Sequence, residues 1–144
     1  MFTAGGASVV AGGMVAAVTG PTHWSHGSWV AAFLVLVAGV AQLAIGAGQA
    51  HLAQGPSSVT FVTAQCLMWN TGCALVIAGT LVSNPATVSA GTAPMVAAIV
   101  MAVVASRRGS PGQRSTDLLG LYRLLLVVAL ASMPIGVALA WARH

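Results

Sequence analysis

Two histidines three residues apart, His23 and His26, have the clearest capacity for chemistry in this chain. They lie in residues 23–29 (HWSHGSW), directly ahead of an apolar run over residues 30–50. If a helix continues through residues 22–29, the two imidazoles share one helical face. Imidazole nitrogens at that spacing can ligate a transition metal, and one of them can be an axial ligand of haem iron. The alternative is that both histidines, beside two tryptophans, are anchors at the membrane surface.

Two further histidines lie far from this pair along the chain. His51 follows His26 by 25 residues along the same predicted helix, so at about 1.5 Å per residue one metal ion cannot bind both. The carboxy-terminal His144 is different, because the topology argued below returns it to the same membrane face. The predicted metal ligands are therefore His23, His26 and His144, and the predicted haem ligands are His26 and His23.

Polar residues within the apolar segments include Gln42, Gln65, Asn70 and Arg123. Unsatisfied polar groups are costly in hydrocarbon, so Gln65 and Asn70, with Trp69, should hydrogen-bond to neighbouring helices, with Gln42 as one candidate partner. Such bonds hold helices together, and the alternative is contact with a ligand. Arg123 either extends to the membrane surface or neutralises an anionic group such as a haem propionate or a lipid phosphate.

The composition is that of an integral membrane protein. Of the 144 residues, 58% are hydrophobic and 4% are charged, against about 25% charged in soluble domains. No Asp, Glu, Lys or Arg occurs between Met1 and Ser106, so the intramembrane carboxylate of a proton-coupled transporter is absent there. No lysine completes a phosphate-binding loop, and no residue set is placed for nucleophilic catalysis. The sequence therefore favours a protein that is not an enzyme.

Hydropathy and turn residues predict an all-α, polytopic transmembrane four-helix bundle forming one domain over residues 1–144. The expected spans are about 27–50, 59–82, 88–105 and 117–142. Residues 1–20 are apolar but rich in glycine. They predict a short helix that lies at the interface or inserts halfway, with a fifth span as the alternative. Small residues should let the spans pack closely, at Gly39, Gly46, Gly72, Gly79 and Gly136.

The hydrophilic loop 106–116 (SRRGSPGQRST) predicts the orientation. It contains three of the five arginines, and positively charged loops remain in the cytoplasm. The carboxy terminus and residues 23–29 then face outward. The pI of 10.7 follows from the arginines, three of which lie in this one loop, and does not indicate a nucleic-acid partner. The lack of lysine beside abundant Ala, Gly and Val favours a bacterial inner (plasma) membrane protein.

Several short stretches together carry a resemblance. His26-Gly27 is followed by a helix with Gly39 and Gln42, then by residues 69–72 (WNTG), and later by Tyr122-Arg123 and residues 132–136 (SMPIG). These resemble small multi-span bacterial membrane proteins, of actinobacterial type, that are distantly similar to haem-copper oxidase subunit I and to NnrS-like haem proteins. The resemblance implies haem ligation by His26 first and His23 second.

The chain departs from that family where later helices carry histidines, unless His144 or a second copy supplies one. The resemblance therefore implies an accessory subunit or a haem- or metal-binding relic. Three functions follow in order. The first is a non-catalytic subunit packed in the lipid bilayer as a homo-oligomer or with a membrane-protein partner. The second is a protein that binds haem b or a transition metal. The third is a small channel lined by Gln42, Gln65 and Asn70, which would require an oligomer.

Overall fold

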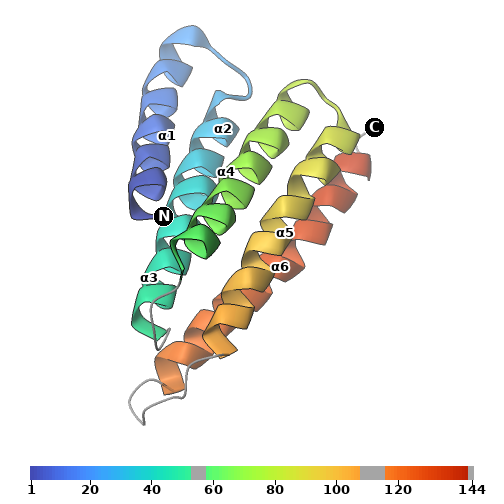
Figure 1. The fold of residues 1–144 in the computed structure, drawn as a ribbon. Helices are drawn as coiled ribbons and strands as arrows, with labels where there is room; N and C mark the ends of the chain where they lie inside the picture. The colour runs from blue at the N-terminus through green and yellow to red at the C-terminus, as the bar shows by residue number, and fades with distance from the viewer. Residues whose placement is uncertain (53–57, 108–115, 143–144) are drawn as a thin grey trace. The chain divides into compact units, whose positions relative to one another are not determined.

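The computed structural model describes residues 1–52, 58–107 and 116–142. In these residues every regular element is helical, which confirms the predicted all-α fold (Figure 1). The elements in chain order are α1 (Phe2–Thr22), α2 (Gly27–Phe33), the π-helical segment η1 (Leu34–Ala41), α3 (Gln42–Leu52), α4 (Val59–Leu81), α5 (Pro85–Arg107) and α6 (Thr116–Ala142). Most of the arginine loop, and His144, lie outside the described residues.

Four of the described helices are long and apolar enough to cross a membrane: α1, the continuous helix Gly27–Ala50, α4, and Pro85–Ala105 of α5. The expectation of a short amino-terminal helix was wrong, because α1 has 21 residues. Its alternative, a fifth span, matches that length. Within α6 the apolar stretch is Tyr122–Ile135. The chain is thus a membrane protein whose α1 contributes a full-length apolar helix.

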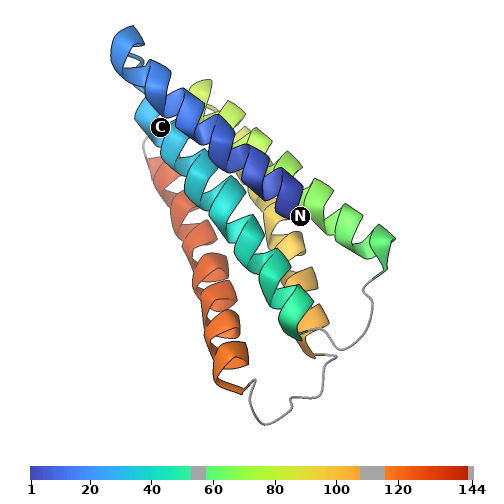
Figure 2. The same cartoon turned by 90° about the vertical axis from the view of Figure 1, so that its left-hand side faces the viewer.

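The described chain divides into two compact units, Met1–Gly46 and Ala47–His144. In the first unit α1 runs antiparallel to α2 and η1 (Figure 2). A Cβ on Gly5 would lie 3.1 Å from the Gly39 carbonyl oxygen, and one on Gly12 would lie 2.9 Å from that of Ala31. Glycines seven residues apart therefore give α1 a flat face on which the next helix packs closely.

In the second unit α4 and α5 are antiparallel neighbours, and α6 lies beside α5 (Figure 1). A short turn joins α4 to α5, as the sequence predicted. Ser83 adopts a left-handed conformation with φ 51°, and the Asn84 side chain accepts hydrogen bonds from the Ala86 and Thr87 N–H groups at 3.0 and 3.2 Å. This cap starts α5 three residues earlier than expected, at Pro85, whose missing N–H costs nothing there.

Two glycines bring the backbones of α4 and α5 together. A Cβ on Gly72 would lie 2.7 Å from the Gly91 carbonyl oxygen, and a Cβ on Gly91 would lie 2.8 Å from that of Gly72. Gly79 is equally tight against the Val88 backbone nitrogen, at 2.7 Å. The predicted packing roles of Gly72 and Gly79 are therefore confirmed, whereas the surroundings of Gly136 lie outside the described residues.

Candidate functional site

The helix expected through residues 22–29 is interrupted. α1 ends at Thr22, and His23 adopts a left-handed conformation with φ 50°. The His23 N–H is bonded to the Gly20 carbonyl oxygen at 3.3 Å, and His26 is the first flanking residue of α2. His23 and His26 therefore lie on a turn between two helices. The premise that they share one helical face was wrong.

The side chains of this turn are open to the surroundings. Both imidazoles are exposed, and Trp24 is 37% exposed. The Ser25 hydroxyl lies 3.1 Å from His26 Nδ1, so His26 Nε2 is the nitrogen left to meet another group. In the described part of the chain, no three His, Cys, Asp or Glu residues form a group that could hold a metal ion. Ligation of haem or metal by His23 and His26 stays a prediction.

The other candidate ligands and charges all belong to the second unit. His144 and the side chain of His51 lie outside the described residues. Arg123 is exposed on α6. Cys66 and Cys73 are free thiols, with Cys73 buried. Of the three histidines predicted to bind a metal, the structure therefore describes two, His23 and His26, and both are exposed.

Buried amides form the most complete polar arrangement in the described residues. Gln65 of α4 is fully buried, and its Nε2 donates to the Ala98 carbonyl oxygen of α5 at 2.8 Å. Its Oε1 accepts from Gln49 Nε2 of α3, also at 2.8 Å. We call this chain of Gln49, Gln65 and Ala98 the amide bridge. It ties α3, α4 and α5 together, which confirms that Gln65 bonds to neighbouring helices. Its side-chain partner is Gln49, where Gln42 was the suggested one.

Asn70 and Trp69 do not behave as predicted. Asn70 Nδ2 donates to the Cys66 carbonyl oxygen of its own helix at 2.7 Å, so it does not link helices. Trp69 is buried, and its indole Nε1–H has no acceptor among the described residues. Gln42 is fully buried as well. A water-filled pore lined by Gln42, Gln65 and Asn70 therefore gains no support from the positions of these amides.

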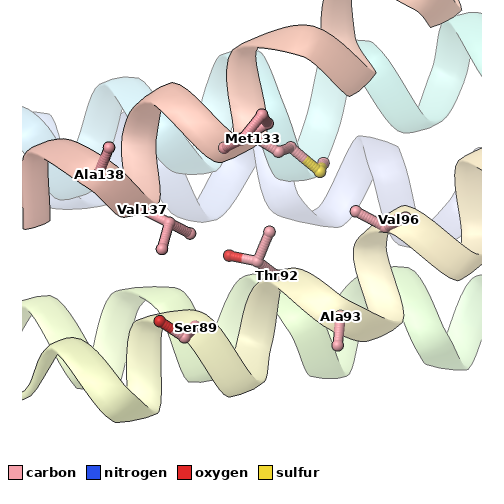
Figure 3. Close-up of a pocket in the computed structure, with 8 residues that line it drawn as sticks. Ser89, Thr92, Ala93, Val96, Met133, Val137 and Ala138 are labelled. Carbon is pink, nitrogen blue, oxygen red and sulfur yellow. The ribbon is translucent and has the colours of Figure 1, made fainter.

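A groove of about 600 Å³, which no sequence pattern predicted, lies between α5 and α6. In Figure 3, Thr92, Met133 and Val137 project into the space between the two helices. The Ser89 and Thr92 hydroxyls donate to carbonyl oxygens of their own helix, at 2.9 Å each. Trp141 Nε1–H donates to Ser89 Oγ at 3.2 Å and joins the two helices near one end of the groove. Because the Ser89 and Thr92 hydroxyls already donate hydrogen bonds within α5, the groove presents a mainly apolar surface. None of its lining side chains is a reactive group.

Comparison with known protein families finds no match to this chain, and neither do the comparisons with curated proteins and with solved structures. The resemblance to haem-copper oxidase subunit I and to NnrS-like proteins stays an untested prediction. The described polar side chains inside the membrane segments act mainly as contacts between or within helices. The candidate sites are therefore the exposed histidine turn and the packing surfaces of the helices.

Proposed function

We propose that this chain is a non-catalytic membrane component that packs against a second copy of itself or a partner membrane protein through α1. The observation that carries the proposal is a second row of glycines on α1. Gly5 and Gly12 are packed on the neighbouring helix, whereas Gly6, Gly13 and Gly20 have no heavy atom of their own unit within 4 Å of where a Cβ would be. Both rows repeat every seven residues.

A glycine on the exposed face of a helix is unfavourable unless close packing against another segment compensates for its lower helix propensity. Each costs roughly 0.5–1 kcal/mol relative to alanine. The inner row offsets that cost through close packing within the first unit. Close backbone approach between small residues is the usual means by which membrane helices associate. The outer row, flanked by the exposed side chain of Val10, supports the same kind of contact with a helix outside the unit.

Replacement of Gly13 by leucine tests this proposal. We expect Gly13→Leu to weaken self-association, or recovery of a copurifying partner, by at least about tenfold, because a 1.4 kcal/mol loss is tenfold. The measurement is sedimentation equilibrium in density-matched detergent, with partner recovery from mild detergent extracts. Ala11→Leu is the matched control, because Ala11 is also exposed on α1 but lies on a different face. Equal association of both variants and the native chain would contradict the proposal.

The positive-inside rule supports one orientation for this component. If all five helical segments cross, the arginine loop 106–116 is cytoplasmic, the amino terminus is cytoplasmic, and residues 23–29 and the carboxy terminus face outward. Single cysteines introduced at Ser25 and Ser110, in a chain lacking Cys66 and Cys73, distinguish the two sides by reaction with a membrane-impermeant maleimide. Labelling of Ser110→Cys in intact cells would reverse the proposed orientation.

A second candidate function is metal or haem binding at the turn, favoured by one observation. Both imidazoles of a four-residue connection, His23 and His26, are exposed, and His26 Nε2 is available. For this candidate we expect the purified protein to show a Soret band, or a bound transition metal, that His26→Ala removes. Visible spectra of oxidised and dithionite-reduced protein, with metal analysis of the same sample, check this. A colourless, metal-free protein would eliminate the candidate for the isolated chain.

A further inference from the structure

The indole of Trp69 is a buried polar group whose position the packing proposal does not explain. The side chain is 2% exposed, inside a helix long and apolar enough to cross a membrane. Its Nε1–H has no acceptor among the residues that the structure describes. An unsatisfied donor costs several kcal/mol in hydrocarbon. By contrast, the indole of Trp141 donates to Ser89 Oγ.

One buried acceptor with spare capacity lies on the same face of α4. Gln65 precedes Trp69 by four residues, and residues at that spacing are neighbours on one face of a helix, with Cβ atoms about 5–6 Å apart. Helical side chains lean toward the amino terminus, which is the side on which Gln65 lies. Gln65 Oε1 accepts a hydrogen bond from Gln49 Nε2, and an amide oxygen has two lone pairs. The second lone pair is therefore an acceptor that a further donor on this face of α4 can use.

We propose that a water molecule is bound between Trp69 and Gln65, accepting from the indole Nε1–H and donating to Gln65 Oε1. Because Trp69 Nε1–H makes no direct hydrogen bond to Gln65, a water molecule that accepts from the indole and donates to the amide would join these neighbouring side chains through two consecutive bonds of ordinary length. Buried water typically occupies such a place between otherwise unsatisfied polar groups, and it needs little room. Both side chains are almost inaccessible, which favours the smallest molecule that can both accept and donate.

The test is NMR spectroscopy of the full chain in detergent micelles, with ¹⁵N-labelled tryptophan. The Trp69 indole signal is assigned as the one lost in Trp69→Phe. We expect a cross-relaxation peak between Trp69 Hε1 and water whose sign is that of a long-lived bound molecule, and we expect Gln65→Leu to abolish it. Gln49→Leu should leave it in place, because this change removes the other partner of Gln65.

Once the Trp69 signal is assigned, the measurement on the native chain decides the matter even if the two glutamine variants fold poorly. A Trp69 Hε1 signal with peaks only to protein or detergent protons, and none to water, would overturn the proposal. A water peak that survives in folded Gln65→Leu would also overturn it, because the second partner would then be another group. The proposal is independent of the association of α1, which is measured separately through Gly13.

Discussion

Replacing Gly91 by alanine is expected to destabilise the packed pair α4 and α5 by about 2 kcal/mol, within the range found for overpacked cores. The added Cβ would lie 2.8 Å from the Gly72 carbonyl oxygen and 2.8 Å from the Val76 nitrogen. Both are backbone atoms, so no rotation of a side chain relieves the contact and the helices must separate. The measurement is equilibrium unfolding in mixed detergent micelles, followed by the helical circular dichroism signal.

A matched control separates this effect from the general effect of alanine on a helix. Gly120 lies in α6 of the same unit, is exposed, and has open space where a Cβ would be. Gly120→Ala should therefore be neutral, or stabilise by up to about 1 kcal/mol through better helix propensity. If Gly91→Ala unfolds with the same free energy as Gly120→Ala, the α4 and α5 backbones do not approach as closely at Gly91 as described.

The glycines show how far the sequence predicts the packing of this chain. Apolar segments containing Gly39, Gly72 and Gly79 indicated closely packed helices, and each of these glycines does face a neighbouring backbone or side chain. The sequence did not pair Gly72 with Gly91, because hydropathy and spacing carry no information on which helix faces which. The pairing depends on the turn at Asn84, which fixes the alignment of α5 against α4.

The amino-terminal region was predicted least well, for two physical reasons. Glycine lowers the mean hydropathy of residues 1–20, which weakens the prediction of a membrane span. In a membrane helix, however, glycine also allows close packing, and Gly5 and Gly12 of α1 pack closely on the neighbouring helix. The helix continues through Gly20 and Pro21 to Thr22, and the chain reverses at His23, a residue type that tolerates the left-handed conformation. The histidines therefore lie on a turn that their spacing alone did not predict.

Helix geometry alone predicts that the side chains of Gln65 and Asn70 face different neighbours. Gln65 and Asn70 are five residues apart, which at 3.6 residues per turn puts them roughly 140° apart around α4. Both cannot face the same neighbour. Gln65 reaches α3 and α5, whereas Asn70 returns its donor to the Cys66 carbonyl oxygen. Helical periodicity thus excludes a shared role, but it does not say which residue faces inward.

Replacing Gln65 by leucine is expected to cost about 2–3 kcal/mol of unfolding free energy. The change removes both side-chain bonds of the amide bridge, and hydrogen bonds between membrane helices contribute roughly 0.6–1.7 kcal/mol each. It also leaves the buried Gln49 amide without its Gln65 partner, which adds the cost of an unsatisfied polar group. The same unfolding measurement applies, because leucine retains apolar volume and the difference reports mainly the lost polar contacts.

Asn70→Leu is the matched control for that experiment. It removes an amide from the same helix, but that amide bonds within α4, so the expected cost is under about 1 kcal/mol. The double variant Gln49→Leu, Gln65→Leu should be more stable than the sum of the single costs predicts, by about 1 kcal/mol, because no amide is then left without its partner. Strict additivity would mean that Gln49 and Gln65 do not interact. A Gln65→Leu cost no larger than that of Asn70→Leu would mean that the helices are held by their glycine contacts and not by the amide bridge.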